Sequence, residues 1–255
     1  MSLINFEKQG KLGWLELNRP DTRNALSLDL MNELIEIISK IKNDESLHVL
    51  IIYGNGPAFS SGHDLKELAG DHDESYYQHI FLTCSNLMQL LTQIPQPVIA
   101  MVHGAATAAG CQLVASCDLA VASEDAVFST PGVKIGLFCS TPMVPLVRLI
   151  GSRRALDMLL TGRFISAHEA KEFGLINSVV SKDKLKDEVE RIAHQIAEYS
   201  KYTVGFGKKT FYEQRDLDLK SAYEHSIKAI TANCMHDDAK EGIIAKIEKR
   251  EAKWK

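Results

Sequence analysis

Two stretches decide the fold of this chain: Phe59-Ser-Ser-Gly-His-Asp-Leu-Lys-Glu-Leu68 and His103-Gly-Ala-Ala-Thr-Ala-Ala-Gly-Cys-Gln112. Each follows an apolar run typical of a buried strand, Leu47–Tyr53 in the first case and Val98–Val102 in the second. Each then passes through small residues into a helical pattern, so two helix N-termini should face one point. Backbone N–H groups in this arrangement can hold an oxygen that gains negative charge, such as that of a thioester becoming an enolate.

The pattern on either side of these stretches predicts an α/β fold with a mostly parallel sheet. Ile4–Gln9 and Leu12–Leu17 have the pattern of a hairpin, and Ser27 is a suitable N-cap for an amphipathic helix. Strands then alternate with helices, and the chain becomes mostly helical after about residue 140. The later helices are expected over 76–94, 112–116, 142–161, 167–173, 182–200, 204–213 and 217–245, with short strands over 119–122, 127–129 and 176–180.

A length of 255 residues suits a single domain, and no linker rich in Pro, Gly or Ser interrupts it. We expect one domain over 1–255, with a core over about 1–200 and a helical C-terminal region over about 201–255. That region has no strands of its own. It should therefore pack on the core or on a neighbouring subunit.

Charge and cysteine content exclude several classes of protein. The net charge of −4 gives no reason to expect a nucleic-acid partner. The five cysteines include no CxxC pair, which favours reduced thiols over disulfides or a zinc site. No apolar run reaches membrane-spanning length, and the first residues have neither signal-peptide nor transit-peptide character. These features together predict a cytoplasmic protein, although mitochondrial relatives are expected.

Further short motifs are spread along nearly the whole chain. In their order and spacing they resemble the enoyl-CoA hydratase/isomerase (crotonase) superfamily, and most of all its domain-containing protein 3 group. The motifs are Leu17-Asn-Arg-Pro20, Ala58-Phe-Ser-Ser-Gly-His-Asp-Leu-Lys-Glu67, Pro97-Val-Ile-Ala-Met-Val-His-Gly104, Gly110-Cys-Gln-Leu113, Gly136-Leu-Phe-Cys-Ser-Thr-Pro142, Leu160-Thr-Gly162 and Glu248-Lys-Arg250.

The resemblance implies a β-β-α superhelix core with a helical C-terminal region, assembled as homotrimers that often pair into hexamers. It implies a coenzyme A thioester as substrate or ligand, no tightly bound cofactor and no metal. By position, the backbone N–H groups of His63 and Ala109 would form the oxyanion hole.

The same resemblance assigns the residues that would bind coenzyme A. The segment His63, Asp64, Leu65 and Lys66 would line the bound thioester and its adenine side. Two basic residues, Arg23 and Lys249, occupy positions that can reach the phosphate or pantetheine groups.

Two positions depart from the family pattern. Family hydratases carry one catalytic glutamate where this chain has Gln112 and a second where it has Gly132. An amide cannot transfer a proton at neutral pH, and glycine has no side chain. Hydration by a pair of carboxylates is therefore not available, and we expect weak hydratase activity.

Three functions remain open at this point. The leading hypothesis is a lyase of hydratase/isomerase type in fatty-acid or acyl-CoA metabolism. The second is a catalytically silent regulatory protein that binds coenzyme A, and the third is another crotonase reaction, such as decarboxylation or thioester hydrolysis. The imidazole of His63 either acts as a base or takes no part in the reaction. A covalent nucleophile at Cys139 or Ser140 is the less favoured interpretation, since no His–Asp partner is evident.

Overall fold

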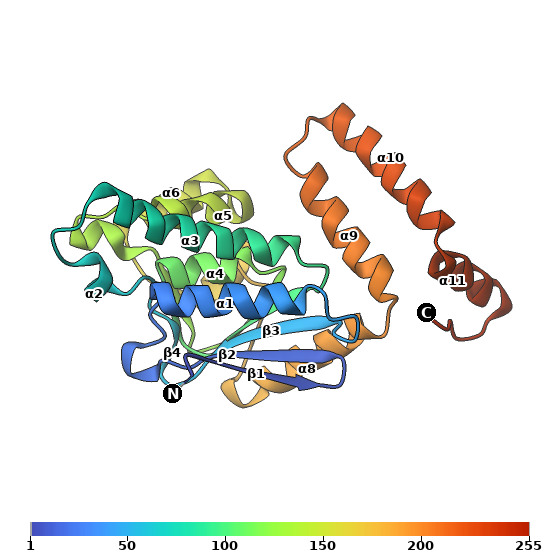
Figure 1. Ribbon diagram of the computed structural model, residues 1–255, viewed down its shortest axis with the longest axis horizontal. Helices are drawn as coiled ribbons and strands as arrows, with labels where there is room; N and C mark the ends of the chain where they lie inside the picture. Colours follow the sequence, from blue (N-terminus) through green and yellow to red (C-terminus); the bar gives the residue numbers. More distant parts are fainter. Residues whose placement is uncertain (1, 255) are drawn as a thin grey trace.

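A computed structural model describes residues 2–254 (Figure 1). Its larger sheet has the order β1-β2-β3-β5-β7-β10, in which β1 and β2 are antiparallel and every other neighbouring pair is parallel. These strands confirm the expected hairpin and the mostly parallel sheet. Their bounds are β1 Ile4–Gln9, β2 Leu12–Leu17, β3 Val49–Gly54, β5 Val98–Val102, β7 Leu119–Ser123 and β10 Ser178–Val180.

Helices cover both faces of this sheet, which explains why its central strands are apolar without alternation. Helices α1 (Leu28–Ile41) and α3 (Glu74–Gln93) lie on one side, and α8 (Leu185–Ala197) lies on the other (Figure 1). Ser27 caps α1 as expected, because its hydroxyl accepts a hydrogen bond from the N–H of Leu30. The main core lies under α1 and α3. The smaller core under α8 contains Leu12, Trp14, Val49, Ile51, Ile99, Val121, Leu185, Val189, Ala193 and Ala197.

A second sheet, β4-β6-β8-β9, is built from very short strands. Its first three strands each follow closely a strand of the large sheet: β4 follows β3, β6 follows β5, and β8 follows β7. A helical segment comes next in each case, so the chain repeats a β-β-α unit, as the family resemblance implied. Sequence patterns missed three of these strands, since two or three residues give no alternation. Their bounds are β4 Ala58–Ser60, β6 Ala105–Thr107, β8 Val127–Ser129 and β9 Ile165–Ser166.

Two of the expected helices are each divided in two. The prediction of one helix over 142–161 was wrong, because Gly151 adopts a φ of +76° and separates α5 from α6. The prediction over 217–245 was also wrong, since His236 is extended and divides α10 from α11.

Within residues 2–254, every helix is too short or too polar to cross a bilayer. The remaining helices are α2 Leu65–Leu68, α4 Ala109–Ser116, α5 Ser140–Ile150, α6 Ser152–Thr161, α7 Ala167–Phe173, α9 Lys201–Gln214, α10 Leu219–Met235 and α11 Asp237–Glu248, with 3-10 turns at Pro20–Thr22, Pro131–Ile135 and Lys182–Lys184.

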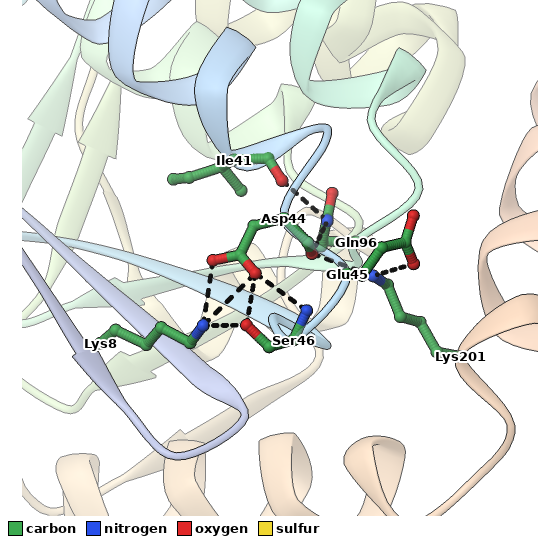
Figure 2. Close-up of polar contacts among 7 residues, drawn as sticks. All are labelled: Lys8, Ile41, Asp44, Glu45, Ser46, Gln96 and Lys201. Atoms are coloured by element: carbon green, nitrogen blue, oxygen red, sulfur yellow. Dashed lines mark hydrogen bonds and ion pairs between the residues drawn. The ribbon is translucent and has the colours of Figure 1, made fainter. Parts of the chain in front are cut away.

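The C-terminal helices α9, α10 and α11 form an arm that extends away from the rest of the fold (Figure 1). The base of the arm is fixed by Lys201, whose ammonium donates to the backbone oxygen of Asp44 at 2.9 Å and to Glu45 at 3.0 Å (Figure 2). Further along α9, Lys208 forms an ion pair with Asp118 at 2.6 Å. These contacts set the direction in which α9 leaves the core.

Candidate active site

Backbone geometry places the two expected oxyanion donors next to each other. The loop after β4 carries His63, and Ala109 is the first residue of α4. A Cβ atom built on Gly62 would lie 3.1 Å from the nitrogen of Ala109 and 2.8 Å from the Cβ of Ala108. The loop therefore contacts the N-terminus of α4, where helical N–H groups have no partner within the helix.

A second close approach holds this arrangement in place. A Cβ on Gly110 would come within 2.3 Å of the backbone oxygen of Ser60, so no larger residue fits at this position. Ala108 adopts φ 49° and ψ −118°, a conformation that residues other than glycine rarely adopt. Its own N–H donates to the oxygen of Ser129 at 2.9 Å, which keeps the strained residue in position.

The donors open onto a cavity of about 530 Å³, which we call the first cavity. Its walls are mostly apolar, and no aspartate or glutamate lies among the described residues that line it. The lining residues come from the loop after β4, from α2 and α3, from the start of α4, and from the segment between β8 and α5. They are Ser61, His63, Leu65, Leu68, Phe81, Ala108, Ala109, Pro131, Gly132, Lys134, Ile135, Leu137, Phe138, Cys139, Ser140, Thr141 and Pro142.

Two titratable side chains of this lining, His63 and Cys139, are uncharged at neutral pH. Burial lowers the pKa of His63 to about 4, so its imidazole is neutral at neutral pH. Its Nε2 atom is buried without a hydrogen-bond partner. Its ring packs edge-to-face against Phe81, with the two ring centroids 5.2 Å apart. Burial raises the pKa of the Cys139 thiol, and the ammonium of Lys134 lies over the Phe164 ring. The lining is therefore a low-dielectric surface around two N–H groups.

Comparison with known proteins agrees with this geometry. A family model described as enoyl-CoA hydratase/isomerase matches residues 7–255. The mitochondrial enoyl-CoA hydratase domain-containing protein 3 of Rattus norvegicus is 48% identical over 252 residues, which is 99% of this chain and 84% of that protein.

Solved structures agree equally well. The enoyl-CoA hydratase of Mycobacterium smegmatis superposes with a TM-score of 0.98 at 42% identity, over 100% of this chain and 99% of that one. Human enoyl-CoA hydratase domain-containing protein 3 superposes with a TM-score of 0.97 at 45% identity, over 99% of this chain and 100% of that one.

The chain belongs to the enoyl-CoA hydratase/isomerase family. Within this crotonase superfamily it falls in the domain-containing protein 3 group, as its motifs indicated. The names of its curated relatives in that group carry the word mitochondrial, so the cytoplasmic compartment inferred from the sequence stays a prediction.

The two positions at which the family resemblance implied glutamates, Gln112 and Gly132, line different cavities. Gln112 is buried in the second turn of α4, with the thiol of Cys84 at 3.9 Å from its Oε1 atom. It lines a neighbouring cavity and not the first one. Gly132 lines the first cavity, but a Cβ there would lie 2.6 Å from the oxygen of Leu137 and 2.9 Å from the sulfur of Cys139. The segment after Gly132 thus occupies the space that a larger side chain would need.

The residues expected to contact coenzyme A are only partly brought together. Leu65 lines the first cavity, and Lys66 lies beside it on the exposed side of α2. The carboxylate of Asp64 accepts a hydrogen bond from the N–H of Lys66 and pairs with Arg19 at 3.0 Å, so it stabilises the loop. Arg23 is exposed, and its backbone oxygen accepts a hydrogen bond from the N–H of Ser61.

Lys249 does not join them. It ends α11, in the arm that extends away from the core (Figure 1). In a single chain it stands apart from the first cavity.

Sequence patterns missed several residues that shape the site. Arg19 donates to the oxygen of Ala25 as well as to Asp64, and buried Asn24 donates to the oxygens of Asn55 and Ala58. Arg19 lies in the motif Leu17–Pro20 and Asn24 in the loop that follows it, so an arginine and an asparagine in one loop were the available signal. The exposed apolar wall residues Ile135, Leu137 and Phe138 could have been found as an apolar run around Gly136.

Replacing His63 by asparagine should remove a pH-dependent part of the folding stability. The unfolded chain protonates this histidine below a pH of about 6.5, whereas the folded chain resists protonation down to a pH of about 4. The unfolded state therefore binds the proton first, and stability falls as the pH drops through that window. At a pH of about 5 this group should account for a loss of about 2 kcal/mol relative to neutral pH.

Urea unfolding at the two pH values measures the effect. The variant His63→Asn should lose less stability on acidification than the wild type, and His168→Asn, at an exposed position on α7, should lose as much as the wild type. An equal loss in all three proteins would show that the imidazole of His63 does not resist protonation.

Proposed function

We propose that this protein binds acyl-CoA thioesters and catalyses a reaction of the hydratase/isomerase class through a thioester enolate. The observation that carries the proposal is the contact between the His63 loop and the first turn of α4, above an apolar cavity. Two N–H groups directed at one oxygen stabilise the charge that develops on it, and they do so more strongly where water is excluded. Family membership supports the thioester as the ligand.

In this proposal the chain supplies orientation and charge stabilisation more than proton transfer. The N–H groups of His63 and Ala109 would hold the thioester oxygen, while Leu65, Phe81 and Phe138 would keep water from the acyl group. The thiol of Cys139 stays protonated because burial raises its pKa. The neutral imidazole of His63 is then the side chain of the lining that is suited to hold or pass a proton.

Decarboxylation is the second candidate, and the absence of any aspartate or glutamate from the described lining favours it. Loss of carbon dioxide breaks the bond between the α-carbon and the carboxyl group and leaves its electron pair on the α-carbon. The enolate therefore forms without a carboxylate base, and a proton then adds to the α-carbon. The same two N–H groups would stabilise that enolate.

Assembly into trimers, or into pairs of trimers, belongs to the same proposal. Exposed apolar residues follow one side of α10, and others lie on α5 and α6. A second copy covering these surfaces would remove them from water. It could also bring Lys249 of one copy to the cavity of another. The residues are Leu219, Tyr223, Ile227 and Ile230 on α10, and Val144, Leu149, Leu156 and Leu160 on α5 and α6.

A matched pair of ligands tests the oxyanion hole. Butanoyl-CoA carries the carbonyl oxygen that the two N–H groups would hold, and S-butyl-CoA lacks it. Two hydrogen bonds of ordinary net strength should make the thioester bind about tenfold more tightly in calorimetry.

The same protein is then incubated with a panel of acyl-CoA and malonyl-type thioesters, and the products are identified by mass spectrometry. Equal affinity for both ligands would argue against the hole. Tight binding without turnover of any thioester would favour the silent regulatory protein.

Hydration of crotonyl-CoA should be slow compared with that by a relative that carries both glutamates. Each missing proton-transfer group commonly accounts for ~10²–10⁴-fold in rate. Gln112→Glu should fold but recover little activity, because this side chain faces the neighbouring cavity. Adding Gly132→Glu should destabilise the protein, because its Cβ would press on the oxygen of Leu137. Spectrophotometric assays measure the hydration rates, and thermal melting measures the stabilities. Fast hydration by the wild type or by the double variant would contradict this expectation and would require a proton-transfer group outside the two positions.

Light scattering at micromolar concentration should give the mass of a trimer or hexamer. Ile227→Lys places a charge in the middle of the apolar side of α10 and should shift the protein towards smaller species. Lys220→Gln, on the same helix, should leave the mass unchanged. A wild-type monomer would refute the assembly.

A further inference from the structure

A second cavity of about 570 Å³ lies beside α4, open on one side and lined by residues of α3, α4, α5 and α9. Thr141, at the start of α5, lines both cavities, while Pro142 faces the first and Val144 faces the second. Ala109 lines the first cavity, and Gln112, about one helical turn later, lines the second. The two spaces are therefore adjacent across Thr141.

Three long apolar side chains from different helices contribute to the second cavity. Met88 from α3, Leu149 from α5 and Phe211 from α9 contribute to its walls. These side chains suit methylene groups and offer them no hydrogen-bond partner. An acyl chain too long for the first cavity could continue here without burying an unpaired polar group.

Positive charge lies at the edge of this cavity, on Arg148 and Arg215. One terminal nitrogen of Arg215, Nη2, is buried without a hydrogen-bond partner. Arg148 donates from Nη1 to the oxygen of Val144 at 3.0 Å, and its Nε is 3.8 Å from the exposed carboxylate of Asp216. Buried guanidinium donors are normally satisfied, so Arg215 points to an acceptor supplied from outside the chain.

The other carboxylate in the lining is already committed. Asp118 accepts the Lys208 ammonium at 2.6 Å and the N–H of Val98 at 2.7 Å on one oxygen. Its second oxygen accepts the hydroxyl of Tyr212 at 2.9 Å. Asp118 is thus neutralised by Lys208, and among the described residues no carboxylate forms an ion pair with Arg215.

We infer that the second cavity is a subsite for the far end of the acyl chain, and that it selects acyl-CoA thioesters whose chain ends in a carboxylate. The inference rests on the proposed binding of thioesters in the first cavity. The chain would pass Thr141 and Gln112, and its terminal carboxylate would pair with Arg215 and with Arg148. A planar guanidinium can give such a carboxylate two parallel hydrogen bonds.

Matched ligands of equal length test this subsite. Octanoyl-CoA is compared with suberoyl-CoA, and decanoyl-CoA with sebacoyl-CoA, by titration calorimetry on the full-length protein. At one of these lengths or both, the ligand that ends in a carboxylate should bind at least about tenfold more tightly, as expected for a hydrogen bond to a charged group.

Two variants connect the preference to the arginine. Arg215→Met keeps the length of the side chain and should abolish the preference while leaving the affinity for octanoyl-CoA unchanged. Arg215→Lys keeps the charge and should retain part of the preference. Arg191→Met, on the exposed side of α8, is the control and should behave like the wild type.

Several results would overturn the inference. One is an equal affinity for both ligands at every length, and another is a preference that survives in Arg215→Met. A third is a smaller oligomer mass for Arg215→Met with no change in ligand preference, which would assign this arginine to packing between copies. If no acyl-CoA of either kind binds the wild type, the proposed function itself fails, and that result is distinct from the others.

Discussion

The close packing of β4 against the first turn of α4 is the constraint on which the site depends. Parallel pairing of β4 with β6 brings the ends of two separate β-β-α units to the same edge. At that edge Gly110 lies so close to the oxygen of Ser60 that any side chain would separate the two segments. A separation of that kind would move the N–H of Ala109 away from that of His63. The proposed chemistry therefore rests on backbone positions that are fixed by packing more than on side-chain groups.

That dependence has an energetic consequence at Ala108. Its backbone conformation costs about 1–3 kcal/mol for a residue with a side chain, and it persists because both neighbours are held. The hydrogen bond to Ser129 fixes one side, and the helix that starts at Ala109 fixes the other. The strain is thus stored directly before Ala109, the proposed oxyanion donor, where a relaxed peptide would turn its N–H elsewhere. A stable core under α1 and α3 makes this local cost tolerable.

The sequence predicted the large sheet well, because long apolar runs such as Val98–Val102 have few alternative structures. It also indicated that the segments of His63 and Ala109 meet, since their motifs resemble those of a known family, whereas their role as oxyanion donors stays a prediction. Of the second sheet it predicted only β8, because the other three short strands owe their pairing to tertiary contacts. Nor could it place the side chain of Gln112, because the choice between two cavities depends on the packing of α3 and α5 against α4. The break at Gly151 was missed because the apolar pattern continues across it.

The crowding around Gly132 limits which substitutions this position can accept. The oxygen of Leu137 and the sulfur of Cys139 occupy the position that a longer side chain would take. A single substitution that places an acidic residue there would meet backbone atoms, and only a prior shift of the segment from Leu137 to Cys139 would make it acceptable. A carboxylate at this position therefore requires at least two coordinated changes, and their order matters because the segment must move first.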